Sequence, residues 1–275
     1  MLAVMFGMLR FGPTQGIVLS ADSDLRAFLS VQALVNTIII NTIVILYALI
    51  LLQRAESELE RQRARAEALV NVVLPDAVAR RLRSGEETRI ADRIDCVTLL
   101  FADLVGFTPV AHTEDPERVV AYLDEFVRAF DLMCDTYGVD KIKTIGDAYM
   151  AAGGLHGRGR ESAVAVGKLA LEMLNVQERR PPIGGHRLQL RIGIHSGTAI
   201  AGVIGETRIS YDLWGDAVNI ASRMQSQGAA GRIQVSEAYR VVVADEFSFE
   251  DRGTTEIRGI GATHTHFLLG AREAD

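Results

Sequence analysis

Hydrophobic and polar positions follow three successive patterns along this chain of 275 residues. The first is a continuous apolar run, because residues 27–53 contain no charge and residues 33–52 read ALVNTIIINTIVILYALILL. A helix that crosses a lipid bilayer needs about 20 such residues. We therefore predict a transmembrane helix over residues 31–53. A buried helix of a soluble protein is the alternative, which the length of the run and its lack of charge disfavour.

The second pattern is a charged segment in which apolar or small residues recur at spacings of three and four. The seam positions are Leu52, Ala55, Leu59, Gln62, Ala66, Leu69 and Val73. Such a heptad favours a parallel two-stranded coiled coil, although alanine and glutamine weaken its core and a single solvated helix is the alternative. Because Pro75 breaks a helix interior, we expect the helix to end near Leu74 and a short second helix to occupy residues 76–83. Residues 54–93 are interpreted as a helical linker.

The charges that flank the apolar run predict its orientation. Arg54, Arg61, Arg63 and Arg65 follow it, whereas Asp22, Asp24 and Arg26 precede it. The positive-inside rule places the residues after the run in the cytoplasm. The expected location is therefore the cell (plasma) membrane, with the lipid bilayer as a partner. Residues 1–30 begin with a short apolar piece that lacks the basic region of a signal peptide. One hypothesis is that this piece is the remnant of a larger membrane domain in a longer parent protein.

The third pattern begins at residue 94, where β-branched runs alternate with amphipathic segments. Strands are predicted at residues 95–103, 141–145, 148–152, 188–195 and 198–204, with helices at 115–137 and 162–176. Hairpin turns are predicted at Gly146-Asp147 and at Ser196-Gly197, and His195 beside the second turn is assigned a structural role. The order β-α-β-β-α-β fits an α/β (α+β) ferredoxin-like sheet with helices on one face. The transmembrane helix and the coiled-coil linker helix precede this domain.

Composition narrows the range of functions. The net charge of −6 disfavours a nucleic-acid-binding surface, and we expect no nucleic-acid partner. Cys96 and Cys134 are too few for a disulfide framework and fit no metal motif, so they are interpreted as buried thiols in a reducing compartment. His264 and His266 share one face of a predicted strand. No third metal ligand is evident beside them, so an ordinary strand surface is favoured over a metal site.

Two acidic residues end neighbouring strands of the predicted sheet. Asp103 ends the first strand in FADLVGFT, and Asp147 lies at the hairpin tip in KTIGDAYM. We expect both carboxylates to meet at one edge, where they can hold Mg²⁺ or Mn²⁺ together with nucleotide phosphates. For Asp147 alone, an ordinary turn aspartate is the alternative. After Asp103 the chain turns into a helix whose backbone N–H groups are candidate phosphate ligands. These residues are Leu104, Val105, Gly106, Phe107 and Thr108.

A short polar helix is predicted in the segment YDLWGDAVNIASR, residues 211–223. Asn219 and Arg223 are four positions apart and project from one face of a helix, with Asp212 just upstream. An amide, a guanidinium and a carboxylate on one element can bind a polar, anionic ligand. A capped surface helix with a solvated polar face is the alternative.

Four motifs in this order, FADLVGFT, KIKTIGDAYM, RIGIHSG and YDLWGDAVNIASRM, resemble the catalytic domain of class III nucleotidyl cyclases. The resemblance covers about residues 94–269, and we assign residues 94–270 to this domain. With the membrane helix and linker in front, the chain resembles the mycobacterial membrane-bound adenylyl cyclases. The resemblance implies conversion of ATP to 3′,5′-cyclic AMP and pyrophosphate. It also implies two Mg²⁺ or Mn²⁺ ions per site and a homodimer with shared active sites.

The resemblance assigns roles to individual residues. Asp103 and Asp147 match the two metal-binding aspartates, and Lys143 and Asp212 match the pair that reads the purine. A lysine ammonium donates to adenine N1, and an aspartate carboxylate accepts from the N6 amino group. Guanine presents O6 and an N1–H. Its O6 is an acceptor and cannot donate to the aspartate carboxylate as the adenine N6 amino group does. The pair therefore disfavours a guanylyl cyclase, which is the enzyme alternative.

The remaining family positions orient the sugar and the phosphates. Asn219 matches the residue that orients the ribose, and Arg223 matches the one that stabilises the pentavalent phosphorus. The family lysine for the β- and γ-phosphates is replaced in the segment Arg258-Gly259-Ile260-Gly261, where Arg258 is the candidate and Arg191 an alternative. A catalytically silent membrane receptor or scaffold domain is the non-enzyme alternative, which the intact set of polar positions disfavours.

Overall fold

The computed structural model of the chain describes residues 23–73, 78, 81, 90–205, 209–257 and 261–272, without the side chains at 23, 25, 26, 63–73 and 257. The chain divides into two compact units, Met1–Leu69 and Val70–Asp275, and each is described by itself. The calls on Pro75, on the helix over residues 76–83 and on Arg258 fall largely or wholly outside the described residues.

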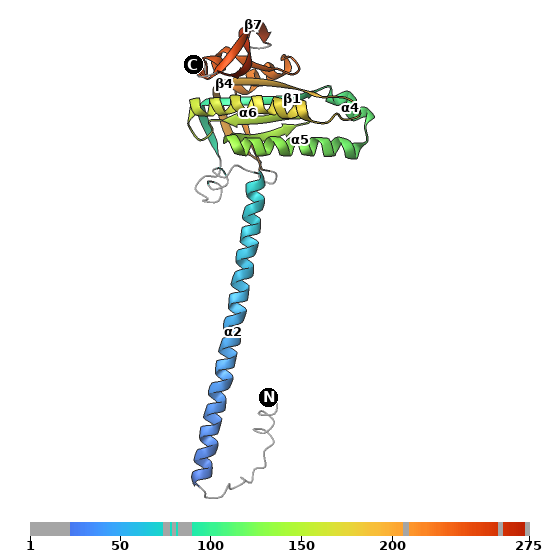
Figure 1. The fold of residues 1–275 in the computed structure, drawn as a ribbon. Coiled ribbons are helices and arrows are strands. Elements are labelled where there is room, and N and C mark those ends of the chain that lie inside the picture. Colours follow the sequence, from blue (N-terminus) through green and yellow to red (C-terminus); the bar gives the residue numbers. More distant parts are fainter. Residues whose placement is uncertain are drawn as a thin grey trace. The chain divides into compact units, whose positions relative to one another are not determined.

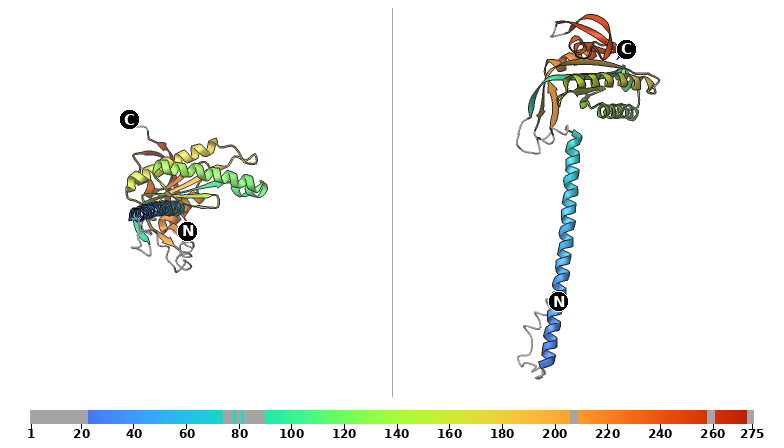
Figure 2. Two further views of the ribbon diagram at one scale, coloured as in Figure 1. Left: turned by 90° about the horizontal axis from the view of Figure 1, so that it is seen from below. Right: turned by 60° about the vertical axis from the view of Figure 1, so that its left-hand side comes forward.

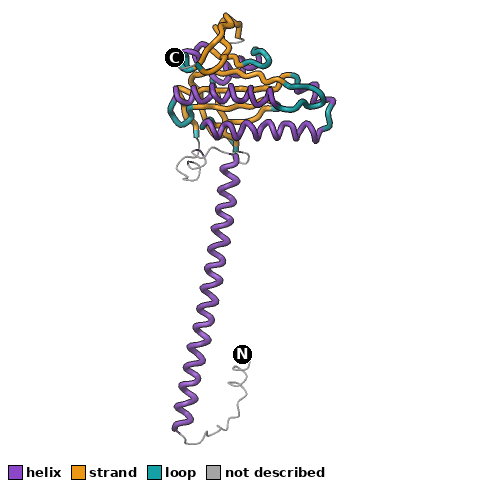
Figure 3. Tube along the Cα trace, viewed as in Figure 1, coloured by secondary structure: helices purple, strands orange, loops and turns teal. Residues whose placement is uncertain are grey.

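The first unit is built on α2 (Ser23–Val73), a single uninterrupted helix of 51 residues (Figure 3). Its segment Ala27–Gln62 is long and apolar enough to cross a membrane, judged by length and composition. The hydroxyls of Thr37 and Thr42 each donate to a backbone carbonyl four residues earlier, at 2.8 Å. Such internal bonds satisfy polar groups where no water is present. The described seam residues from Leu52 to Gln62 are exposed, and the structure does not show a coiled coil.

The second unit contains the predicted ferredoxin-like core. Its strands are β1 (Ala91–Val105), β2 (Asp140–Ile145), β3 (Ala148–Gly153) and β4 (Gln189–Ile204), adjacent in the order β2-β3-β1-β4. All three of these pairings are antiparallel. Helices α5 (Pro116–Tyr137) and α6 (Gly159–Arg179) join the strands and cover one face of the sheet (Figures 1 and 2). The predicted fold class is confirmed.

Further elements extend this core on the side of β4. The sheet continues through β6 (Ile233–Ser236), β8 (Gly261–Ala271) and β7 (Phe247–Ile257), while β5 (Ser210–Trp214) pairs separately with β4. The helices of this part are α7 (Asp216–Ser226) and α8 (Glu237–Val242), and the short α4 (Phe107–Thr113) follows β1. The long antiparallel pairing of β7 with β8 was not predicted from the sequence.

Alternation along β1 assigns its side chains to two different cores. Leu100, Ala102 and Leu104 pack with the α5 and α6 side chains. Leu99 and Phe101 lie on the opposite face, which β5 and α7 cover. Because successive side chains of a strand point to opposite faces, Asp103 shares the face of Leu99 and Phe101. The sheet register therefore directs Asp103 towards α7.

The predicted hairpin at Ser196-Gly197 is wrong. Both residues lie inside the continuous strand β4, opposite Thr98 and Val97 of β1. A Cβ atom at Gly197 would meet the Ala217 Cβ of α7 at 3.1 Å. The glycine thus permits a close approach of α7 to the sheet, whereas the sequence pattern was interpreted as a turn.

The two cysteines differ from the prediction that both are buried. Cys134 is buried in α5, and burial raises the pKa of its thiol to about 11. Cys96 is exposed, at the irregularity where the β1–β4 register shifts between Ile94 and Val97. A strand bulge leaves a residue without its usual place in the ladder, which accounts for the exposure.

Candidate active site

The two metal-binding aspartates predicted from the sequence lie together at one edge of the sheet. Asp103, near the end of β1, pairs with Ala148 of β3. Asp147 is the residue before Ala148 and lies in the turn between β2 and β3, where Gly146 adopts a φ of 63°. Burial, followed by the charge of the nearby Asp103 carboxylate, raises the pKa of Asp147. Two carboxylates this close destabilise each other's charge unless a cation lies between them. Carboxylate oxygens are the ligands that Mg²⁺ and Mn²⁺ prefer, so this donor set fits a divalent cation.

Asp103 is oriented by two side chains from other elements. Arg191 lies directly opposite on β4, and its Nη2 donates to Asp103 Oδ2 at 2.8 Å. Gln225 near the end of α7 donates to the same oxygen at 3.0 Å. The buried Nε of Arg191 has no hydrogen-bond partner among the described residues. Gln225 was not predicted from the sequence, because its contact with Asp103 depends on how α7 packs against β4.

Lys143 and Asp212 form a direct ion pair, although they are 69 positions apart in the sequence. Lys143 extends from β2 and Asp212 from β5, and Nζ lies 2.5 Å from Oδ2. The other Asp212 oxygen accepts a hydrogen bond from the Leu213 backbone N–H at 2.8 Å. The Asp212 side chain is only 16% exposed. A donor-only group and an acceptor-only group are therefore held side by side.

Asn219 and Arg223 lie on the outer face of α7. Both are exposed, whereas Ala217, Ala221 and Met224 on the opposite side of the helix are buried. Among the described residues, neither Asn219 nor Arg223 has a side-chain hydrogen bond or an ion pair. The structure thus unites Asp103 with Asp147 and Lys143 with Asp212, but it leaves the amide and the guanidinium facing outward.

The residues predicted to contact phosphate differ in their local structure. β1 continues to Val105 before the chain turns at Gly106, whose φ of 83° is left-handed. Leu104 and Phe107 are buried, with their side chains packed against the α5 and α6 side of the sheet. The Leu104 and Phe107 side chains are therefore not available to an anion beside Asp103, whereas Thr108 is exposed.

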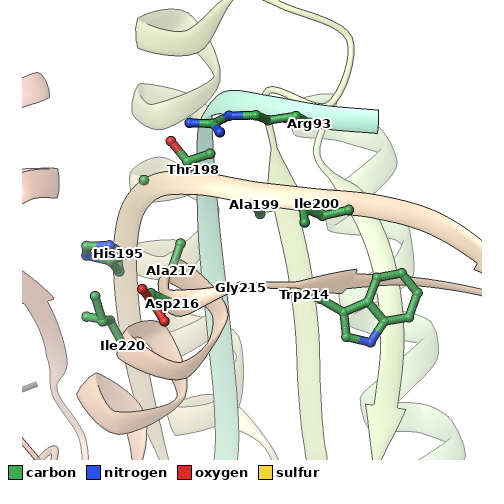
Figure 4. Close-up of a pocket in the computed structure, with 11 residues that line it drawn as sticks. Arg93, His195, Thr198, Ala199, Ile200, Trp214, Gly215, Asp216, Ala217 and Ile220 are labelled. Atoms are coloured by element: carbon green, nitrogen blue, oxygen red, sulfur yellow. The ribbon is translucent and has the colours of Figure 1, made fainter. Parts of the chain in front are cut away.

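A separate hollow of about 380 Å³ lies at the start of α7. Its lining includes none of the residues predicted to bind metal, purine, ribose or the reacting phosphorus, which are Asp103, Asp147, Lys143, Asp212, Asn219 and Arg223. Figure 4 shows Trp214 on one side of it and His195, Asp216 and Ile220 on the other. His195, which was predicted to lie beside a turn, is in the middle of β4 and is buried. Its Nδ1 lies 2.7 Å from Ser236 Oγ, and burial lowers its pKa to about 4. A neutral, hydrogen-bonded core histidine agrees with the predicted structural role.

Comparison with known proteins places this geometry in a family. The model of the adenylate and guanylate cyclase catalytic domain matches residues 90–270. An adenylate cyclase of Mycobacterium tuberculosis is 39% identical over 221 residues, which are 80% of this chain and 50% of that protein. Human atrial natriuretic peptide receptor 2 is 41% identical over 227 residues, which are 80% of this chain and 21% of the receptor. The chain thus spans half or less of the length of these curated relatives.

Solved structures agree with the fold. The guanylate cyclase domain of RhGC from Catenaria anguillulae in complex with GTP has a TM-score of 0.64 and 28% identity, covering 66% of this chain and 100% of that domain. The adenylyl cyclase CyaB from P. aeruginosa has a TM-score of 0.60 and 25% identity, covering 66% of this chain and 97% of that one. Both purine specificities therefore occur among the similar proteins.

Proposed function

The chain belongs to the adenylate and guanylate cyclase catalytic domain family, and we propose that it is a membrane-anchored adenylyl cyclase that converts ATP to 3′,5′-cyclic AMP and pyrophosphate. The observation that carries the choice of ATP is the ion pair between Lys143 and Asp212. In the proposed pose, Lys143 donates to adenine N1 and Asp212 accepts from the N6 amino group. Guanine in the same pose would set its N1–H against the ammonium and its O6 against the carboxylate.

The reaction is an in-line attack of the ribose 3′-OH on the α-phosphorus. Asp103 and Asp147 would hold two Mg²⁺ or Mn²⁺ ions, which supply charge neutralisation and lower the pKa of the 3′-OH when bound. Arg223 would place its guanidinium on the developing charge at phosphorus, and Asn219 would orient the ribose. Arg191, Arg258 and the backbone of residues 104–108 are the proposed triphosphate contacts. No side chain is assigned as general base.

Two copies of the chain would complete each site. Asn219 and Arg223 are exposed on α7 and have no partner among the described residues, which supports a second copy as the missing half. In a symmetric homodimer, Asp103 and Asp147 of one copy would face Lys143, Asp212, Asn219 and Arg223 of its partner, forming two equivalent sites. The heptad segment from Leu52 to Val73, which lies within α2, would hold the copies together as a coiled coil.

The anchor is assigned to the N-terminal apolar helix. The span at Ala27–Gln62 has the length and composition of a membrane helix, and the arginines after residue 53 would keep residues 94–270 in the cytoplasm. The protein would then act at the cell membrane.

Product analysis tests the proposed function. The purified full chain in detergent is incubated with ATP or with GTP at saturating Mn²⁺ and at saturating Mg²⁺, and the cyclic nucleotides are separated by chromatography. We expect kcat/KM for ATP to exceed that for GTP by at least about tenfold, since each mismatched charged hydrogen bond costs about 1.5–3 kcal/mol. A preference for GTP would assign a guanylyl cyclase instead. Failure to form either product would support the silent receptor or scaffold domain.

A further inference from the structure

Three potential metal ligands, to none of which a nucleotide contact is assigned, converge on the β7–β8 hairpin. Asp251 of β7 lies directly opposite His266 of β8 in the antiparallel register, and His264 is two residues from His266. Residues that face each other across strands share a face, and so do residues two apart. The register therefore places all three side chains on one face.

The side-chain contacts match this placement. His264 Nε2 lies 2.9 Å from Asp251 Oδ1, and His266 Nδ1 lies 4.0 Å from the same oxygen. The three ligand atoms all fall within 4.8 Å of one another. The register shift between Asp251 and Gly253 orients the carboxylate, because the Gly253 N–H donates to Asp251 Oδ1 at 2.7 Å.

A fourth residue fixes the ring of His266. Its Nε2 lies 2.6 Å from Glu237 Oε2 on α8, and the His266 side chain is only 9% exposed. Arg240 donates to both carboxylate oxygens of Glu237, at 2.8 and 2.6 Å, so Glu237 is an acceptor in its contact with His266 and the hydrogen is assigned to His266 Nε2. In the neutral ring, Nδ1 then presents a lone pair towards Asp251. Metal-binding histidines commonly donate their second N–H to a carboxylate in this way.

We propose that Asp251, His264 and His266 form a binding site for a divalent transition-metal ion of the Zn²⁺ class. Two imidazole nitrogens and one carboxylate oxygen are a common three-residue zinc set, with a fourth position left for water. Ligand atoms around tetrahedral zinc lie about 3.3 Å apart, so shifts of about 1 Å close the site. Mg²⁺ prefers oxygen ligands only, so the two metal sites differ in selectivity. The third ligand was missed because it lies on the neighbouring strand.

Metal titration of the full chain tests this proposal. Untagged, metal-stripped protein in detergent is titrated with ZnCl₂ by calorimetry in excess Mg²⁺, which fills oxygen-only sites, and with Co²⁺ by visible absorption. We expect one Zn²⁺ per chain, a Co²⁺ absorption band, and a Zn²⁺-dependent rise in the unfolding temperature. His264→Gln and Asp251→Asn, both at exposed positions, are expected to weaken Zn²⁺ binding at least tenfold. Glu237→Gln is expected to weaken it about tenfold.

His156→Gln is the matched control. His156 Nε2 lies 3.5 Å from Asp140 Oδ1 and is 56% exposed, but no second histidine of the described residues joins this pair in a metal cluster. Its Zn²⁺ affinity should equal that of the wild type. Equal affinity in His264→Gln and Asp251→Asn would overturn the proposal, and so would an absence of Zn²⁺ binding. Loss of the Zn²⁺ site in Asp103→Asn instead would assign the ion to the active-site carboxylates and overturn it equally.

Discussion

The Lys143 ammonium lies 2.5 Å from the Asp212 carboxylate. The two charges neutralise each other within one chain, and the backbone N–H of Leu213 holds the second carboxylate oxygen in place. The groups proposed to read the purine are therefore preorganised by the β2 and β5 backbones. A bound adenine would exchange part of this ion pair for its own two hydrogen bonds, which links nucleotide affinity to the strength of the pair.

Replacing the lysine should reduce purine discrimination. In Lys143→Met the donor to adenine N1 is lost and Asp212 loses its counter-charge. We expect kcat/KM for ATP to fall about 10- to 100-fold, with a smaller change for GTP. Steady-state kinetics with both nucleotides measure the ratio. Lys141→Met is the matched control, because Lys141 is on the same strand and pairs with Asp131 at 2.7 Å. An unchanged ATP-to-GTP ratio in Lys143→Met would contradict the assignment.

Complementation between inactive variants tests the shared site. Asp103→Ala and Arg223→Ala are each expected to lower kcat at least 100-fold. When the two are co-expressed, random pairing makes half of the dimers mixed, and each mixed dimer has one intact site. About a quarter of wild-type activity should then return. Co-expressed Asp103→Ala and Asp147→Ala provide the control, because both lesions lie in the metal half and no intact site forms. Equal activity in the two mixtures would exclude sites shared between copies.

The contact between β4 and α7 should tolerate no added atom at Gly193. A Cβ there would lie 2.0 Å from the Gln225 backbone nitrogen, so α7 would have to move. We expect Gly193→Ala to lower the free energy of unfolding by about 3 kcal/mol and to abolish activity, because Gln225 holds Asp103. Gly270→Ala is the control, since a Cβ at Gly270 meets nothing within 4 Å. Calorimetric unfolding of both variants measures the difference, and equal stabilities would refute the tight contact.

Stability should decrease in mild acid because of His195. Burial lowers the pKa of His195 from 6.5 to about 4. Between these pH values the unfolded chain binds a proton at His195 that the folded chain does not bind. This contribution is fully present above pH 6.5 and is lost as the pH falls towards 4. By pH 5 about 2 kcal/mol of this contribution has been lost. Unfolding temperatures at pH 7 and pH 5 measure it. His195→Gln should show a smaller decrease, whereas a change at the exposed His186 should not.

Local patterns predicted the elements that short-range physics determines. An apolar run with β-branched residues predicted β1, and helical periodicity predicted α5, whose Asp115 caps the first turn through the Glu117 N–H. The meeting of Asp103 with Asp147 followed from strand order alone. The interpretation of Ser196-Gly197 failed because that glycine serves a contact with α7, far away in the sequence. Gln225 and Asp251 were not predicted for the same reason, because each contacts residues that only the tertiary fold brings close to it.

Because α2 has no break, the direction in which each of its faces points depends on the number of residues in the helix. A helix advances about 100° per residue, so 51 residues without a break form a rod about 75 Å long with no hinge to absorb a twist. Inserting seven residues after Gln53 would nearly restore the original facing of the rest of α2, up to Val73. Inserting three or four would turn the seam of each copy partly away from its counterpart. Signalling through such a rod would depend on rotation, and the number of inserted residues, rather than their identity, would set the output.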